Sequence, residues 1–344
     1  MTRVLTNDDI EQLLTMSDCM QALELAYREH TNGLAAGGTS RVETVLPSRA
    51  AGVDYEFTSM EGAVPALDTM ALRCNSNHML LRQSGGLQRK DRLPAAPGGR
   101  YVGLILLFSL TDLRLKGILQ DGFISAMRVG GANALAARHL ARADAAVVGL
   151  LGSGDQARMQ IVGMAAVRKL REVRVFSPRR ERREAFAEEM RRKTGIPIHP
   201  VSSGREATRG VDILVAATNS FEPVFKADWL AEGMHVTAIL SHEVPAAAYR
   251  RADLVIVNTK SGYGRGTAGH YDSSTDWARY PTLGDLLSAK TPGRKNDSQI
   301  SFFMNNAGIG FQFAAVGAKV LEMAATAEIG YELPDELFLQ TWHT

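Results

Sequence analysis

Two glycines separate an apolar run from a helix-like run in the segment VVGLLGSGDQARMQ, which begins at Val147. The pattern is G-x-G-x-x-A. Because it follows an apolar strand and opens a helix, it predicts a loop that binds the pyrophosphate of a dinucleotide. Glycines permit the tight turn and the close approach of the backbone, and the helix N-terminus supplies N–H donors. The candidate cofactor contacts are Gly152, Ser153, Gly154, Gln156 and Ala157.

The segment VFSPRRERR, at the end of the next expected strand, bears on the choice of cofactor. An acidic residue there would bind the ribose 2′-hydroxyl of NAD. This chain has Ser177 at that position, followed by Arg179 and Arg180. A hydroxyl and guanidinium groups suit a 2′-phosphate, so we expect NADP(H) to be preferred, with NAD(H) as the alternative. The other interpretation is that these arginines simply begin a solvated helix.

Polar residues also follow the fourth expected strand, in DILVAATNS. Thr218 and Asn219 fall at the carboxyl edge of the expected sheet, where ligands bind in open α/β sheets. Either they contact the nicotinamide ribose, or they cap the next turn.

Strands and helices alternate through this part of the chain. The expected strands are AAVVGLL, EVRVFS, IPIHPV, DILVAAT, MHVTAIL and ADLVIVN, and helical segments separate the first three. Such alternation predicts an α/β fold with a Rossmann-type doubly wound parallel sheet. A last long helix is expected in GIGFQFAAVGAKVLEMAATAEIG, after a loop-rich stretch at 259–300.

The first part of the chain has a different pattern and predicts a second, α+β domain. Apolar residues at three- and four-residue steps predict helices near the N-terminus. The short runs RVETVL, DTMALRCN and YVGLILLFSL then predict strands of a mostly antiparallel sheet. The basic segment RQSGGLQRKDRLPAAPGGR is expected to be a loop between two of them, which is either solvated or acts as a lid or a cofactor contact.

Composition excludes several classes of protein. The 344 residues include 39 basic and 37 acidic side chains, so the net charge of +2 gives no general attraction to nucleic acid. No apolar run approaches the ~18–20 residues that cross a bilayer, so we expect no membrane partner. The cysteines, Cys19 and Cys74, stand in unrelated contexts. They favour a reducing cytoplasm over a disulfide framework, and no metal site is expected.

Several motifs together point to a known family: DGFISAMRVGGANALAARHLAR, VGLLGSGDQAR, DILVAATNS, GMHVTAI and TPGRKNDSQISFF. In this order they resemble the ornithine cyclodeaminase/mu-crystallin family over nearly the whole chain. The resemblance implies a substrate-binding and dimerisation domain at 1–128 and 320–344, and an NAD(P)-binding Rossmann domain at 129–319. It also implies a homodimer, with each active site in the cleft between the two domains.

The resemblance further implies that basic residues grip the carboxylate of a small substrate. The matching positions are Arg41 in SRVETVLP, Arg73 in ALRCNSN and Arg128 in DGFISAMR, and the segment of Arg128 matches best. Arg73 stands where the family has a lysine; a guanidinium keeps the charge but does not release its proton at working pH. The alternative for each of the three is a purely structural salt bridge or contact.

Two other positions depart from the family pattern. In GMHVTAILSHEVP, His242 is in register with the aspartate that handles protons and the amine in cyclodeaminases. Histidine exchanges protons near neutral pH, so His242 is a candidate catalytic residue together with Arg73; the alternative is a loop histidine that faces water. Phe313 stands where many relatives have an acid, which indicates an altered pocket wall or plain helix packing.

The leading functional hypothesis is an NADP(H)-dependent oxidoreductase that acts on a C=N or CH–NH bond next to a carboxylate. This class includes ketimine reductases and amino-acid dehydrogenases, whose substrates are imino or amino acids. One alternative is an ornithine-cyclodeaminase-like lyase that recycles NAD within each turnover; the missing aspartate at position 242 counts against it. The other is a non-catalytic protein that binds NADPH and a small ligand, as mu-crystallin-like members do.

Overall fold

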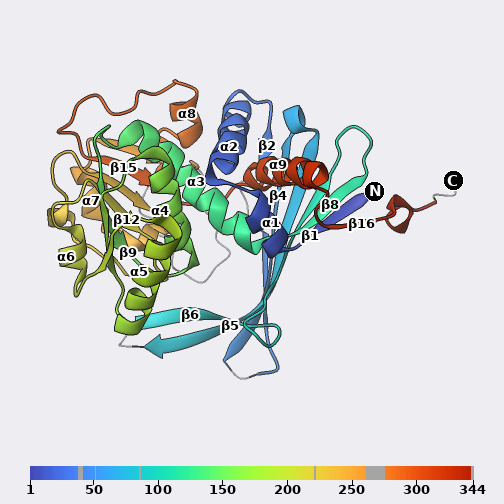
Figure 1. Cartoon of the computed structure of the whole chain (residues 1–344), viewed down its shortest axis with the longest axis horizontal. Helices are drawn as coiled ribbons and strands as arrows, with labels where there is room; N and C mark the ends of the chain where they lie inside the picture. The colour runs from blue at the N-terminus through green and yellow to red at the C-terminus, as the bar shows by residue number, and fades with distance from the viewer. Residues whose placement is uncertain (38–41, 51, 85–86, 221, 261–275, 342–344) are drawn as a thin grey trace. The chain divides into compact units, whose positions relative to one another are not determined.

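The computed structural model describes residues 1–37, 42–50, 52–84, 87–220, 222–260 and 276–341. It divides into two compact units, drawn with their elements in Figure 1. The first unit contains Met1–Arg128 and Ile309–Thr344, and the second contains Val129–Gly308.

The second unit is built on a parallel sheet of seven strands. These are β9 (Val147–Leu151), β10 (Glu172–Phe176), β11 (Ile198–Pro200), β12 (Ile213–Ala216), β13 (His235–Ala238), β14 (Leu254–Val257) and β15 (Ser301–Met304). Their order is β11-β10-β9-β12-β13-β15-β14, and every neighbouring pair is parallel. The expected α/β fold with a Rossmann-type parallel sheet is confirmed.

Helices connect these strands and cover the sheet. They are α4 (Asp155–Val167), α5 (Arg180–Thr194), α6 (Gly204–Thr208), α7 (Ala246–Arg251) and α8 (Leu283–Leu287), with 3-10 turns at Ala227–Trp229, Ser241–Glu243 and Trp277–Arg279. A further helix, α3 (Gly122–Leu140), begins in the first unit and continues into the second.

Both faces of the parallel sheet are buried. In β9, Val147 and Leu151 belong to one apolar cluster, whereas Val148 and Leu150 belong to another. Successive side chains of a strand point to opposite faces, so the two clusters lie on opposite sides of the sheet. Burial on both sides explains why these strands read as continuous apolar runs in the sequence.

The first unit contains a larger, mostly antiparallel sheet. Its strands are β1 (Thr2–Leu5), β2 (Ala36–Gly37), β3 (Val42–Pro47), β4 (Val53–Val64), β5 (Thr69–Ser84), β6 (Leu87–Leu93), β7 (Val102–Phe108), β8 (Leu115–Gln120) and β16 (Tyr331–Leu333). The main order is β16-β1-β8-β7-β5-β4-β2, with β3 paired to β4 and β6 paired to β5. Only the β1–β8 pair is parallel among the described strands of this sheet.

The basic segment expected as a loop is in fact largely a two-stranded ribbon. Strand β5 extends to Ser84 and pairs antiparallel with β6, from His78 opposite Leu93 to Ser84 opposite Leu87 (Figure 1). Among the described strands, β6 pairs only with β5, so it forms an edge and needs no apolar face. Its sequence, LQRKDRL, therefore lacks the alternation that identifies a half-buried strand.

Three helices complete the first unit with the start of α3: α1 (Asn7–Leu13), α2 (Met16–Thr31) and α9 (Gly310–Ala327). Helix α9 packs on β4, β5 and α2. A Cβ atom at Gly62 of β4 would lie 2.1 Å from the backbone nitrogen of Phe311, so glycine permits this close approach. Since α9 packs here from its first turn, the unit boundary lies between Gly308 and Ile309 rather than at 319.

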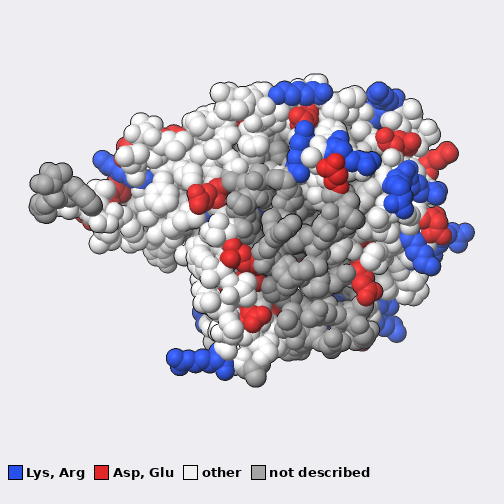
Figure 2. Space-filling view, turned by 180° about the vertical axis from the view of Figure 1, so that it is seen from behind, with Lys and Arg blue, Asp and Glu red and all other residues white. Residues whose placement is uncertain are grey.

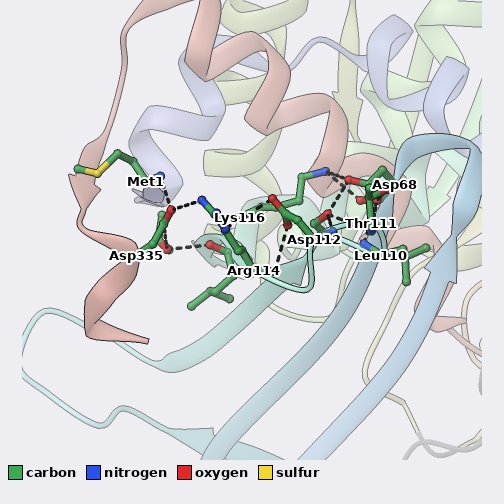
Figure 3. Close-up of polar contacts among 11 residues, drawn as sticks. Met1, Asp68, Leu110, Thr111, Asp112, Arg114, Lys116 and Asp335 are labelled. Atoms are coloured by element: carbon green, nitrogen blue, oxygen red, sulfur yellow. Dashed lines mark hydrogen bonds and ion pairs between the residues drawn. The ribbon is translucent and has the colours of Figure 1, made fainter. Parts of the chain in front are cut away.

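Asp68 holds the turn between β7 and β8 (Figure 3). Its carboxylate accepts hydrogen bonds from Ser109 Oγ at 2.8 Å, from Leu110 N at 2.9 Å and from Thr111 N at 2.8 Å. The hydrogen bonds from Ser109 and Thr111 lower the pKa of Asp68 to about 2. This carboxylate is therefore ionised at neutral and mildly acidic pH.

A second aspartate, Asp335, ties the C-terminal segment to the start of the sheet (Figure 3). Asp335 begins the 3-10 turn Asp335–Leu337 and accepts from the α-amino group of Met1 at 2.9 Å and from Arg114 Nη1 at 3.2 Å. The neighbouring strand β16 pairs with β1. The first and last strands of the described chain are thus joined.

Acidic side chains lie among the basic ones over the face drawn in Figure 2, which matches the nearly balanced composition. Among the described residues, no helix is both long enough and apolar enough to cross a lipid bilayer.

Candidate active site

The glycine loop lies between β9 and α4. Gly152 has a φ angle of 116°, and a Cβ atom there would lie 2.1 Å from the carbonyl oxygen of Ala217. Only glycine therefore allows the loop to pass this close to the end of β12. Ala157 is fully buried, where a larger side chain would push α4 away from the sheet.

The start of α4 fits the phosphates of a dinucleotide. Gly154 is the N-cap residue and supplies no side-chain hydrogen bond to the first turn. A Cβ atom at Gly154 would meet open space, so the backbone is accessible there. Gln156 has a buried side-chain oxygen without a hydrogen-bond partner among the described residues. Uncapped N–H groups at a helix N-terminus are suited to bind an anion.

The end of β10 lies beside this loop. The hydroxyl groups of Ser153 and Ser177 are 2.9 Å apart. Arg179 is the N-cap of α5, and Arg180 is largely exposed, with its Nε atom 2.7 Å from Glu184 Oε1. The structure thus places the hydroxyl and both arginines of the expected 2′-phosphate site in one short segment after β10.

The ends of β12 and β13 are joined by a buried carboxyl group. Glu243 accepts a hydrogen bond from the backbone N–H of Thr218 at 2.5 Å and from that of Leu240 at 3.2 Å. Thr218 is half-buried and Asn219 is exposed. His242 is half-buried in the 3-10 turn Ser241–Glu243. Glu243 therefore positions the expected ribose contacts and the expected catalytic histidine relative to each other.

The sequence analysis did not predict a role for Glu243 at this edge of the sheet, although it did for the neighbouring His242. Burial raises the pKa of the Glu243 carboxyl to about 7, and the N–H groups of Thr218 and Leu240 oppose this rise. A carboxyl group that gains and loses a proton near neutral pH is uncommon outside functional sites.

Arg73 lies in β5 of the first unit and is mostly buried. Its Nε atom is 2.7 Å from Asp121 Oδ2, and the same oxygen accepts from Asn75 Nδ2 at 2.9 Å. A Cβ atom at Gly103 would lie 2.1 Å from Asp121 Oδ1, so this glycine leaves room for the carboxylate. The ion pair orients the guanidinium through Nε. Among the described residues, neither terminal nitrogen of Arg73 has a hydrogen-bond acceptor, so both can bind another one.

Arg128 lies in α3 and is 9% exposed. Its Nη1 atom donates to Gln312 Oε1 at 3.0 Å, and Gln312 Nε2 donates to the hydroxyl of Tyr27 at 2.6 Å. The guanidinium carbon of Arg128 is 5.1 Å from the centroid of the Phe313 ring, and that of Arg73 is 5.6 Å from the same centroid. The structure thus brings two of the three expected carboxylate-binding arginines together. Arg41 lies outside the described residues.

A model of the ornithine cyclodeaminase/mu-crystallin family matches residues 1–326. The chain belongs to this family. It is similar to alanine dehydrogenase of Archaeoglobus fulgidus, at 25% identity over 352 aligned positions that cover 96% of this chain and 98% of the relative. It is also similar to a Δ(1)-pyrroline-2-carboxylate reductase of Bacillus cereus, at 28% identity over 214 positions that cover 58% of this chain and 65% of the relative.

A solved structure extends the likeness. The Δ(1)-pyrroline-2-carboxylate reductase of Thermococcus litoralis, in complex with NADH and L-proline, matches with a TM-score of 0.80 and 25% identity. The match covers 96% of this chain and all of the other chain. The fold of this member of the ornithine cyclodeaminase/mu-crystallin family is therefore shared with an oxidoreductase.

The sequence analysis of this family member did not single out three residues as contacts: Asp121, Gln312 and Glu243. Asp121 and Gln312 contact the arginines of the first unit, and Glu243 joins the ends of β12 and β13 in the second. Asp121 had a signal, because the acid precedes Arg128 in the DGFISAMR motif. Gln312 and Glu243 had no such signal in the sequence. Glutamine in a helix and glutamate in a turn usually lie at the surface, so their burial could not be predicted from residue type.

Proposed function

We propose that this protein is an NADP(H)-preferring oxidoreductase that acts on a C=N or CH–NH bond next to a carboxylate. The observation that carries the proposal is the meeting of Arg73 and Arg128 at one aromatic ring, in a chain that also has a glycine loop suited to a dinucleotide. Guanidinium groups bind carboxylates through charge-assisted hydrogen bonds. The relatives named above include enzymes of imino and amino acids.

In the direction of reduction, a cofactor held at the glycine loop, Gly152 to Ala157, would supply a hydride to the imine carbon. The nitrogen gains a proton, so that C=N becomes CH–NH. Arg73 and Arg128 hold the carboxylate and thereby orient the reacting carbon. His242 is the proposed proton donor, because an imidazole exchanges protons near neutral pH.

We also propose that the protein is a homodimer, paired through the first unit. Helix α9 contacts the face of the sheet that carries Leu107 and Gly117. The opposite face is apolar: the neighbouring strands β5, β7 and β8 place Leu72, Leu106 and Ile118 side by side, and all three are only half-buried. An apolar sheet face that stays partly exposed in the described chain favours a partner surface.

The decisive experiment is turnover of a panel of substrates. The purified protein is supplied with NADPH and, in turn, Δ(1)-pyrroline-2-carboxylate, its six-membered homologue, or pyruvate with ammonia or methylamine, and NADPH absorbance is followed. Steady consumption with at least one of them is expected. Release of ammonia from ornithine without net NADPH change would instead identify a lyase, and tight NADPH binding without any turnover would identify a binding protein.

Arg128→Ala tests the carboxylate site in the same assay. Losing a charge-assisted contact to a buried partner should lower kcat/KM by roughly 30- to 1,000-fold, and Arg128→Lys should recover only part of it. Arg138→Ala, on the exposed last turn of the same helix, is the matched control and should leave kcat/KM unchanged. Normal turnover by a folded Arg128→Ala variant would show that Arg128 is only structural.

A further inference from the structure

Helices α4 and α5 pack together on one face of the parallel sheet. Ala157 and Ile161 of α4 belong to the same buried apolar cluster as Phe186 of α5. Each helix begins at one part of the proposed cofactor site: α4 follows the glycine loop, and α5 follows Arg179. A dinucleotide with a 2′-phosphate has to meet both helix starts at once, so the spacing of the two starts affects its binding.

A bidentate ion pair connects the two helices. Arg158, one turn into α4, donates from Nε to Glu189 Oε1 at 2.9 Å and from Nη2 to Glu189 Oε2 at 2.7 Å. Its third nitrogen, Nη1, lies 3.1 Å from Asp155 Oδ1 in the first turn of α4. Its guanidinium carbon is also 5.5 Å from the centroid of the buried Phe186 ring. Because all three nitrogens of Arg158 have carboxylate acceptors, this side chain acts on the helices rather than as a phosphate ligand.

The geometry of this pair restricts how the two helices lie. Two planar groups joined by parallel hydrogen bonds fix both distance and angle, which a single contact does not. The hydrogen bonds between Arg158 and Glu189 raise the pKa of the guanidinium and lower the pKa of the carboxyl, so both groups are ionised at neutral pH. Each side chain is only 27% exposed, so solvent weakens this pair less than the more exposed pair of Arg180 with Glu184.

We infer that Arg158 and Glu189 are positioning residues for cofactor selection, a role that rests on the proposed preference for NADP(H). They hold the start of α5, with Ser177 and Arg179 beside it, at a fixed distance from the glycine loop. A ligand with two binding groups benefits from both sites only if the spacing of the sites matches its own. NADPH depends on this spacing, whereas NADH needs only the pyrophosphate site at α4.

Two variants test the ion pair, and a third is the control. Glu189→Gln removes the charge of the acceptor, and Arg158→Lys keeps the positive charge but replaces the planar fork with a single ammonium group. Glu188→Gln is the matched control, because Glu188 also forms an ion pair, with Arg191 at 2.6 Å, but within α5. Dissociation constants of NADPH and NADH are measured by fluorescence titration. That of adenosine 2′-monophosphate is measured by competition with NADPH.

The expected result is a change in preference rather than a general loss of binding. Glu189→Gln and Arg158→Lys should each lower the preference for NADPH over NADH about 3- to 30-fold, and Glu188→Gln should leave it unchanged. Adenosine 2′-monophosphate carries the group for the second site alone, so its dissociation constant should change less than about twofold in every variant. If its binding were weakened as much as that of NADPH, the pair would act on the 2′-phosphate site itself, and the inferred role in spacing would be wrong.

The remaining outcomes separate this inference from the proposed function. A wild-type protein that binds NADH as tightly as NADPH would overturn the proposed cofactor preference. A wild-type preference for NADPH that both Glu189→Gln and Arg158→Lys retain would overturn only the role of the ion pair. A defect in Glu189→Gln that Arg158→Lys does not share would show that charge acts here instead of the bidentate geometry.

Discussion

Glu243 has an unusual combination of full burial and two backbone donors. Its pKa is raised to about 7 from an ordinary value of 4.5. Between these values the folded protein keeps a proton that the unfolded chain has released, so the contribution of this group to the free energy of unfolding falls as pH rises. Glu243→Gln is neutral throughout. Its stability relative to the wild type should therefore increase by about 1–3 kcal/mol between mildly acidic and mildly alkaline pH.

The measurement is the difference in unfolding free energy between variant and wild type in urea, taken across this pH range. Glu222→Gln makes the same chemical change on an exposed side chain and is the control. A difference in unfolding free energy between Glu243→Gln and the wild type that does not change with pH would show that this carboxyl does not titrate in this pH range.

At the residue scale, the sequence predicts the polar groups but not most of their partners. Arg73 and Arg128 were expected to bind a carboxylate, and the structure brings their guanidinium groups to one ring. Phe313 was noted only as a departure from an acid. The contact depends on β5, α3 and α9, which are far apart in the chain, so no local pattern could reveal it. The same holds for Glu243 and Thr218, which meet only because β12 and β13 are neighbours.

At the scale of elements, the segment from β10 to the start of α5 is the part that we propose selects the cofactor. Arg179 and Arg180 stand beside Ser177, and the ion pair of Arg180 with Glu184 is exposed and therefore weak. Both arginines can turn to a 2′-phosphate at little cost. The double variant Arg179→Ala with Arg180→Ala should weaken NADPH binding about 30- to 300-fold and change NADH binding less than about threefold.

Fluorescence titration of both cofactors measures this effect. Arg192→Ala with Lys193→Ala removes the same charge from the other end of α5 and should leave both affinities nearly unchanged. A wild-type preference for NADH of about tenfold or more, equal to about 1.4 kcal/mol, would contradict the expected selectivity.

Most strands of the second unit could be predicted because the sheet is buried on both faces and its strands read as apolar runs. Two strands, one in each unit, could not be predicted from the sequence. Strand β15 is the short run SFFM after a loop-rich stretch, and only its place between β13 and β14 makes it a strand. Strand β6 is charged along its length and is stabilised by backbone pairing with β5. In both, tertiary pairing decides the structure where side-chain pattern does not.

At the scale of the whole molecule, the half-buried apolar face of the first sheet predicts a homodimer. The single chain has a mass of 37.3 kDa, and light scattering at micromolar concentration should give twice this mass. Leu106→Glu places a charge in the middle of this face and should produce monomers, since burying an unpaired carboxylate is costly. Leu113→Glu, on the exposed turn between β7 and β8, should remain dimeric. Circular dichroism must show that both variants are folded. A wild-type monomer would contradict the pairing.

The division of the chain has a consequence for the order in which the protein can fold during synthesis. The second unit is continuous from Val129 to Gly308, whereas the first needs residues from both ends. On the ribosome, domains fold as units while the chain emerges. The second unit can therefore be finished while the first still lacks α9 and β16. Until they emerge, the surface at Gly62 lacks α9 and the edge of β1 lacks β16. A nascent chain stalled before Ile309 should therefore bind chaperones strongly.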